Sequence, residues 1–220
     1  MNLLKLYDDL YQKYGPQGWW PLLETGYQKL DFSYPKNQTQ SFEIALGAIL
    51  TQNTAWLNVE KTLNNLKNQE LLLPEKILAA PDKVLQNAIR SSGYYNQKLK
   101  KIKIFTTFFL SLKNRTPARN ELLNLWGIGP ETADSILLYA YKIPSFVIDA
   151  YTKRLLINLY GADKIPQNYH DLKNLFETNL PADYELFQEY HALIVANGKL
   201  VNLKTYKPVL PKVNRSDQSV

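Results

Sequence analysis

Along most of the chain, apolar residues recur at intervals of three and four, the spacing that gives an α-helix one buried face. The first such stretch, Leu3 to Tyr14, ends at Gly15-Pro16, a pair that stops helices. No stretch shows sustained alternation of apolar and polar residues, so we expect almost no strand. The pattern predicts an all-α protein, with further helices over residues 41–50, 55–66, 74–80, 82–90, 116–125, 151–160, 170–180 and 182–197.

The most informative stretch runs from Leu122 to Leu156. Within it, Leu125-Trp126-Gly127-Ile128-Gly129-Pro130 predicts a tight hairpin that opens a helix, because glycine supplies unusual backbone angles and proline fits the first helical position. A turn of this kind leaves backbone N–H groups free at a helix start, which suits a phosphate. The buried face of the helix that follows is formed by Ala133, Ile136, Leu137 and Ala140.

Asp149 lies twenty residues after Gly129, behind an apolar triplet and directly before a predicted helix. On local grounds such an acid is an ordinary helix N-cap. The two histidines of the chain, His170 and His191, lie near none of these motifs. In Gly18-Trp19-Trp20-Pro21, two adjacent indoles stand in a turn context. Either one of them lines a surface or pocket, or both cover a domain edge.

Composition narrows the class of protein. The 220 residues can bury a core in one domain or two small ones, and a hydrophobic content of 45% excludes a disordered chain. The net charge of +6 favours a polyanionic partner, although proteins that bind none show similar excesses. There is no cysteine, which excludes disulfides and cysteine-ligated metals. With no signal peptide and no apolar run of membrane-spanning length, we expect no membrane contact and a cytoplasmic location.

The hairpin and Asp149 together resemble the helix-hairpin-helix and Gly/Pro…Asp signature of the endonuclease III superfamily of DNA base-excision glycosylases. The family hairpin L-P-G-V-G-x-K-T-A matches residues 125–133, and its V-D-T-H segment matches residues 148–151. The resemblance implies that Asp149 drives cleavage of the N-glycosidic bond, and that the partner is double-stranded DNA with a damaged base, bound by a monomer. The hairpin residues it assigns to DNA binding are Gly127, Ile128, Gly129, Glu131 and Thr132.

Two further segments match the family. Thr51-Gln52-Asn53-Thr54 separates two predicted helices, where polar residues are usually caps. The family carries a glutamine there that fills the space left by a flipped nucleotide, which implies this role for Gln52. Residues 91–98 resemble the family turn G-L-Y-N-x-K-A. Lys98 and Lys101 could then face DNA, although a solvated helix face is the simpler interpretation of any single lysine.

The family architecture implies two helical lobes with a DNA-binding cleft between them. The first is a central bundle over residues 38–142. The second combines residues 1–37 with residues 143–220 and carries Asp149. These boundaries are expectations from the resemblance, since hydrophobic periodicity alone does not divide the chain.

Two departures from the family shape the expected activity. Members that also cut the DNA backbone place a Schiff-base lysine where this chain has Glu131, and a carboxylate cannot form an imine with the sugar. We therefore expect a monofunctional glycosylase. Asn197-Gly198-Lys199 resembles the tripeptide that precedes the four-cysteine iron–sulfur loop of endonuclease III, but the cysteines are absent, so we expect no cluster and a loop over 198–213 held by packing. Some clusterless relatives are thought to carbamylate a lysine that matches Lys199; an ordinary exposed lysine is the alternative.

A chain without cluster or Schiff-base lysine, with Trp19-Trp20-Pro21, the segment 51–54 and Trp56, is similar to the clusterless 3-methyladenine DNA glycosylase III subgroup. This similarity implies release of N3-alkylated adenine. An indole face attracts a cationic base by about 1–2 kcal/mol once water is excluded. The residues implied around the base are Trp20, Pro21, Trp56 and Lys199. No cofactor is expected beyond a Na⁺ or K⁺ ion for which the candidate ligands are the hairpin carbonyls of Leu123, Leu125 and Ile128.

Two other functions stay open at this point. One is a glycosylase for hypoxanthine, uracil or mismatched thymine, whose neutral bases need hydrogen-bond donors that the sequence does not place. The other is a non-catalytic DNA-binding protein, because helix-hairpin-helix units also serve as simple grips on the backbone. A carboxylate such as Asp149, facing a polyanion, argues against pure binding.

Overall fold

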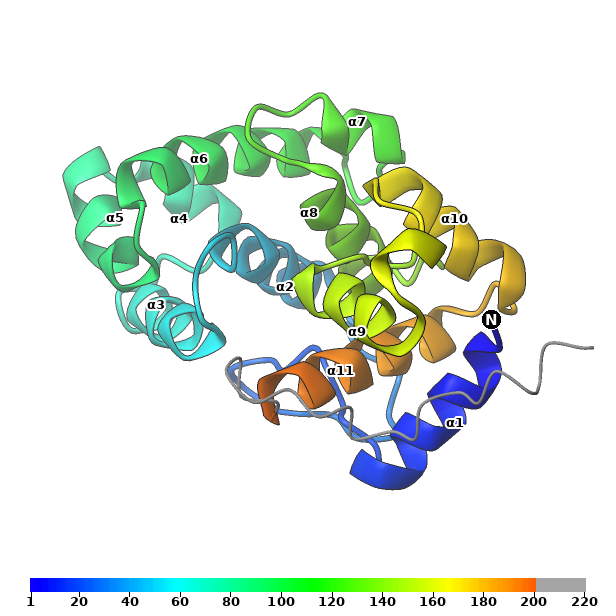
Figure 1. Cartoon of the computed structure of the whole chain (residues 1–220). Coiled ribbons are helices and arrows are strands. Elements are labelled where there is room, and N and C mark those ends of the chain that lie inside the picture. The colour runs from blue at the N-terminus through cyan, green and yellow to red at the C-terminus, as the bar shows by residue number, and fades with distance from the viewer. Residues whose placement is uncertain (201–220) are drawn as a thin grey trace, which may run out of the picture. The chain divides into compact units, whose positions relative to one another are not determined.

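The computed structural model describes residues 1–200, and their regular structure is helical (Figure 1). Within these residues the one β interaction is an isolated bridge between Leu22 and Gly26, so the predicted all-α class is confirmed. Most of the predicted loop over 198–213 lies outside the described residues. No helix of the described part is long and apolar enough to cross a membrane.

The chain forms two compact units, one made of Met1–Trp19 with the chain from Pro144 onward (unit 1) and one made of Trp20–Ile143 (unit 2). Unit 1 contains α1 (Leu3–Tyr14), α9 (Ala150–Tyr160), η3 (Ala162–Lys164), α10 (Tyr169–Asn179) and α11 (Tyr184–Leu200). Unit 2 contains α2 (Gln38–Leu50), α3 (Trp56–Asn68), α4 (Pro74–Ala79), α5 (Asp82–Ile89), η1 (Arg90–Ser92), α6 (Tyr95–Ser111), α7 (Arg119–Leu123), α8 (Pro130–Ser135) and the π-helical η2 (Ile136–Ala140).

The segment 20–37 differs from the expected lobes, since it belongs to unit 2 and not to the unit of α1. Its start is held by contacts with α2: the Trp20 indole lies against Gly47, and the Leu23 N–H donates to the Glu43 carboxylate at 2.7 Å. Any Cβ at position 47 would stand 3.1 Å from the indole. Glycine at that position therefore lets the segment pack closely on α2.

The core of unit 2 is built around α2, which packs against α3, α6, α8 and η2. Its residues from Ser41 to Leu50 are all buried, as expected from their nearly continuous apolar run. Phe42 of α2 packs on Phe105 and Phe109 of α6, with ring centroids 6.3 and 5.0 Å away. The helix begins where the Asn37 side chain accepts the Gln40 N–H at 3.0 Å.

The core of unit 1 joins α10 and α11 to the segment before Asp149. Phe146 stacks on Phe176 with centroids 4.0 Å apart and meets Phe187 edge-on. Tyr190 of α11 is fully buried, and its hydroxyl donates to the Leu3 carbonyl at the start of α1. These contacts fix the direction from which the chain enters α9, and so place Asp149.

Candidate active site

Asp149 caps α9. Its backbone is extended (φ −105°, ψ −177°), and its Oδ1 accepts the Thr152 N–H at 2.7 Å and the Thr152 hydroxyl at 2.9 Å. The N-cap prediction from the local pattern is thus confirmed. The side chain is 12% exposed, so the carboxylate is largely withdrawn from water.

The second oxygen of this carboxylate faces His191, a residue that lies near none of the sequence motifs. His191 is buried on α11, and its Nε2 lies 3.6 Å from Asp149 Oδ2. Burial raises the pKa of the Asp149 carboxyl, but the interaction with His191 and the hydrogen bonds from Thr152 outweigh it and set the pKa below its ordinary value. The carboxylate is therefore ionised at neutral pH. The signal that could have found His191 is a titratable side chain within the apolar run of a buried helix.

The hairpin is made by α7, the turn at Gly127 and α8. Arg119 of α7 forms a bidentate ion pair with the fully buried Asp134 of α8, with N–O distances of 2.7 and 2.9 Å. Gly127 has φ +82°, and a Cβ there would stand 2.6 Å from Cε of Lys101, so only glycine fits. α7 begins at Arg119 and not at the expected residue 116, because Pro117 disfavours helical backbone in the residue before it.

Several residues that the resemblance assigns to DNA contact surround the hairpin turn. The Gln52 amide nitrogen donates to the Gly127 carbonyl at 3.0 Å and to the Thr132 hydroxyl at 2.9 Å. Its amide oxygen accepts from the Lys101 ammonium. Gln52 thus belongs to the same hydrogen-bonded cluster as the turn, and Lys101 covers Gly127 on one side.

Lys98 requires a correction, because it does not face a surface. It is 1% exposed, and its ammonium donates to the Leu50 carbonyl, the Thr54 hydroxyl and the Ser92 carbonyl at 2.6–2.7 Å. Burial lowers its pKa to about 8, with a further contribution from the charge of Lys101. A DNA phosphate cannot reach this group. Lys98 instead ties together the end of α2, the segment of Gln52 and the end of η1.

The other hairpin residues differ in how far they are exposed. The Ile128 side chain is buried and its N–H donates to the Leu125 carbonyl at 3.1 Å, so little of this residue is presented outward. Gly129 has an ordinary backbone conformation, and a Cβ there would meet no atom within 4 Å. Glu131 is exposed in the first turn of α8. The space beside Gly129 is therefore open at the distance of a side-chain carbon.

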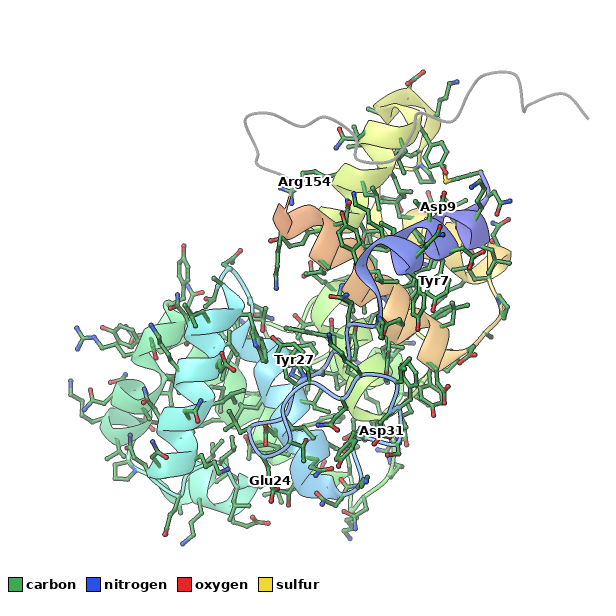
Figure 2. The ribbon with its side chains drawn as sticks, turned by 90° about the horizontal axis from the view of Figure 1, so that it is seen from below. Tyr7, Asp9, Glu24, Tyr27, Asp31 and Arg154 are labelled. Atoms are coloured by element: carbon green, nitrogen blue, oxygen red, sulfur yellow. The ribbon has the colours of Figure 1, made fainter. Side chains whose placement is uncertain are left out.

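The predicted aromatic residues pack together in unit 2. The Trp20 and Trp56 rings meet edge-on, with centroids 5.3 Å apart and planes at 88°. Trp20 and Pro21 are buried, and the Trp20 ring also lies 5.3 Å from that of Tyr139. Trp56 is partly exposed, and the nearby Tyr27 is half-exposed (labelled in Figure 2). Trp20 is therefore a core residue, and Trp56, which it contacts, is partly exposed.

Lys199 lies in unit 1, near the end of α11. Its ammonium is 5.5 Å from the ring centroid of Trp19, a cation–π contact. Partial burial lowers the pKa of this ammonium, although the residue as a whole is exposed. Lys199 and Asp149, which lies at the start of α9, thus belong to the same unit.

Comparisons with known proteins identify relatives across most of the chain. The model of the family described as "HhH-GPD superfamily base excision DNA repair protein" matches residues 46–182. The chain is 43% identical to "Putative DNA repair glycosylase MJ1434" of Methanocaldococcus jannaschii, over 90% of this chain and 87% of that protein. It is 28% identical to endonuclease III of Sulfolobus acidocaldarius, with 82% of each chain covered.

Solved structures with the same fold include two of direct interest. The H. pylori 3-methyladenine DNA glycosylase (MagIII), bound to 1,N6-ethenoadenine, aligns with a TM-score of 0.69 at 26% identity, covering 90% of this chain and 98% of its own. A non-covalent endonuclease III–DNA complex aligns with a TM-score of 0.73 at 18% identity, covering 95% and 91%.

Proposed function

We propose that this chain, which belongs to the HhH-GPD superfamily of base excision DNA repair proteins, releases N3-alkylated purines such as 3-methyladenine from duplex DNA and leaves an abasic site. Family membership establishes a DNA glycosylase that acts on DNA. The alkylated base, and the absence of backbone cleavage, are the parts that we add. The observation that carries the choice of base is the pairing of Trp56 with the buried Trp20.

Alkylation at N3 makes adenine cationic, and this determines what the enzyme must supply. When the N-glycosidic bond breaks, its electron pair neutralises the base, so no general acid is required. The sugar becomes an oxocarbenium-like cation, which an ionised carboxylate stabilises. Water then adds to the sugar carbon and loses a proton. We assign the stabilisation of the sugar cation to Asp149, which is ionised and fixed by Thr152.

Recognition of the base requires a surface that prefers a cation. A flipped base is read by stacking and by contacts to its edge, and an indole face attracts positive charge. Trp56 is partly exposed and held edge-on by Trp20, so its face is positioned before the base arrives. A neutral base gains less from such a face. The H. pylori relative, named for 3-methyladenine, supports the same choice.

Binding of the duplex is assigned to the hairpin. Open space beside Gly129 admits a DNA backbone, and Gln52, already bonded at the turn, is near the position where the duplex would be opened. The Leu125 carbonyl accepts one hydrogen bond from Ile128 and retains a second lone pair. It thus remains a candidate ligand for a Na⁺ or K⁺ ion at the hairpin.

The decisive experiment is incubation of the protein with methylated duplex DNA, followed by chromatography of the released bases. We expect 3-methyladenine in the supernatant and intact strands that break only on alkaline treatment. Asp149→Asn should abolish release while DNA binding persists, because the charge acts at the transition state. Release of uracil or hypoxanthine without 3-methyladenine would overturn the choice of base and leave the family activity in place.

Trp56 provides the test of base recognition. Trp56→Ala should lower the rate of excision far more than DNA affinity, since affinity comes mainly from phosphates. Trp56→Phe should keep part of the activity, because it retains a ring with a weaker quadrupole. Leu57→Ala is the matched control. Leu57 is the exposed neighbour of Trp56 on α3, so this variant should release the base at the wild-type rate. A lower melting temperature in Trp56→Ala, with normal excision by the protein that remains folded, would instead assign Trp56 to packing.

A further inference from the structure

The two oxygens of the Asp149 carboxylate face groups from different helices of unit 1. Thr152, on α9 itself, donates twice to Oδ1. Oδ2 faces Nε2 of His191 on α11, at 3.6 Å. We infer that His191 is a positioning residue for Asp149, which fixes the second oxygen and keeps the carboxylate ionised in acid solution. The inference rests on the proposed function, in which Asp149 is the catalytic residue.

Geometry supports the positioning role. A carboxylate held at one oxygen can pivot about it, and the charge then moves relative to the sugar. A contact at the other oxygen removes this freedom. His191 is 7% exposed and α9 packs on α11, so the imidazole has no room to swing away. Electrostatic catalysis depends on charges that are already in place when the transition state forms.

The charge of the imidazole supports the second role. Desolvation alone would raise the pKa of the Asp149 carboxyl, yet the pKa lies below its ordinary value because His191 and Thr152 stabilise the charged form. The contact with His191 therefore favours the charged carboxylate and opposes its protonation.

Other ionisable groups of the helices in unit 1 have partners of their own. From α9, Lys153 donates to a backbone carbonyl and Arg154 (labelled in Figure 2) lies over an aromatic ring. On α11, Glu189 accepts a backbone N–H, and from α1 Tyr14 donates to an asparagine side chain. From α10, the Tyr169 hydroxyl accepts the N–H of Ile148, the residue before Asp149, at 3.5 Å. His191 is thus the group to substitute.

The test compares the pH dependence of base release. Single-turnover release from methylated duplex is measured from acid to neutral pH for the wild type and His191→Gln, which stays polar but carries no charge. We expect the rate of base release by the variant to fall at a higher pH than the rate of the wild type. The ratio of the wild-type rate to the variant rate should therefore grow as pH falls, with DNA affinity unchanged. His170→Gln is the matched control, because His170 is exposed on α10 and should keep the wild-type profile.

A lower rate with an unchanged pH profile would overturn the inference, since it is the signature of lost packing alone. If His191→Gln does not fold, carbon NMR of the wild type decides: the Asp149 carboxyl resonance should shift again at the pH where the His191 ring titrates, and no such second step would refute the pairing. A wild type that releases no alkylated purine would overturn the proposed function. The NMR titration would still test, independently of activity, whether His191 is paired with Asp149.

Discussion

Replacement of Lys98 by methionine removes a charge from the interior of unit 2 while keeping a long apolar side chain. Lys98 donates to two backbone carbonyls, of Leu50 and Ser92, and to the Thr54 hydroxyl. The Ser92 carbonyl keeps the Thr54 hydroxyl as a donor, so the Leu50 carbonyl is the one left without a partner, at a cost of about 1–3 kcal/mol. The lost charged hydrogen bond to Ser92 adds to this cost, whereas the ammonium no longer has to be desolvated, an effect that lowers its pKa to about 8 in the wild type. We expect a net loss of about 1–3 kcal/mol, a sizeable share of a typical folding free energy.

Urea denaturation followed by circular dichroism measures this loss. Lys100→Met is the control: Lys100 is exposed and its ammonium lies 4.1 Å from the ring centroid of Trp126, so its removal should change stability little. A loss below about 1 kcal/mol in Lys98→Met would refute the argument that the Leu50 carbonyl depends on Lys98. The same variant should keep the salt dependence of DNA binding, because a buried ammonium neutralises no phosphate.

The same residue predicts a pH dependence. Its pKa of about 8 in the folded protein lies below the ordinary 10.5, so between these values the unfolded chain binds more protons. Stability from this group must therefore increase as pH rises from about 8 to 10.5, and Lys98→Met should lack that increase. A stability difference between wild type and variant that stays constant over this window would contradict the assigned pKa.

Three further predictions concern the hairpin. Gly127→Val should weaken binding to any duplex, measured by fluorescence anisotropy, because φ +82° and the Lys101 side chain leave no room for a Cβ; wild-type affinity in a folded variant would make the turn purely structural. Arg119→Met should cost about 3–5 kcal/mol in thermal unfolding, since it removes the bidentate ion-pair partner of the buried Asp134 carboxylate; a melting temperature within error of wild type would oppose this. Glu131→Lys should allow borohydride trapping on abasic DNA, which the wild type should not show.

Features set by neighbouring residues could be read from the sequence. The helices follow from the three-and-four spacing of apolar residues, and the turn at Gly127 from the demand for a positive φ. The cap at Asp149 likewise depends on Thr152, three residues along the chain. In each case the partners are close in sequence, so the local pattern contains the information.

Tertiary packing decided the rest. Lys98 looks like a surface lysine beside Lys100 and Lys101, and only the convergence of α2, η1 and α6 gives its ammonium three buried acceptors. His191 meets Asp149 because α11 packs on α9, and no periodicity links the two positions. A sequence pattern reports which face of a helix is buried, but the partner of a buried polar group depends on which helices that face meets. For this protein, local sequence determined the helix cap at Asp149 and the turn at Gly127, the resemblance to a family made Asp149 the catalytic candidate, and packing determined the groups that hold them.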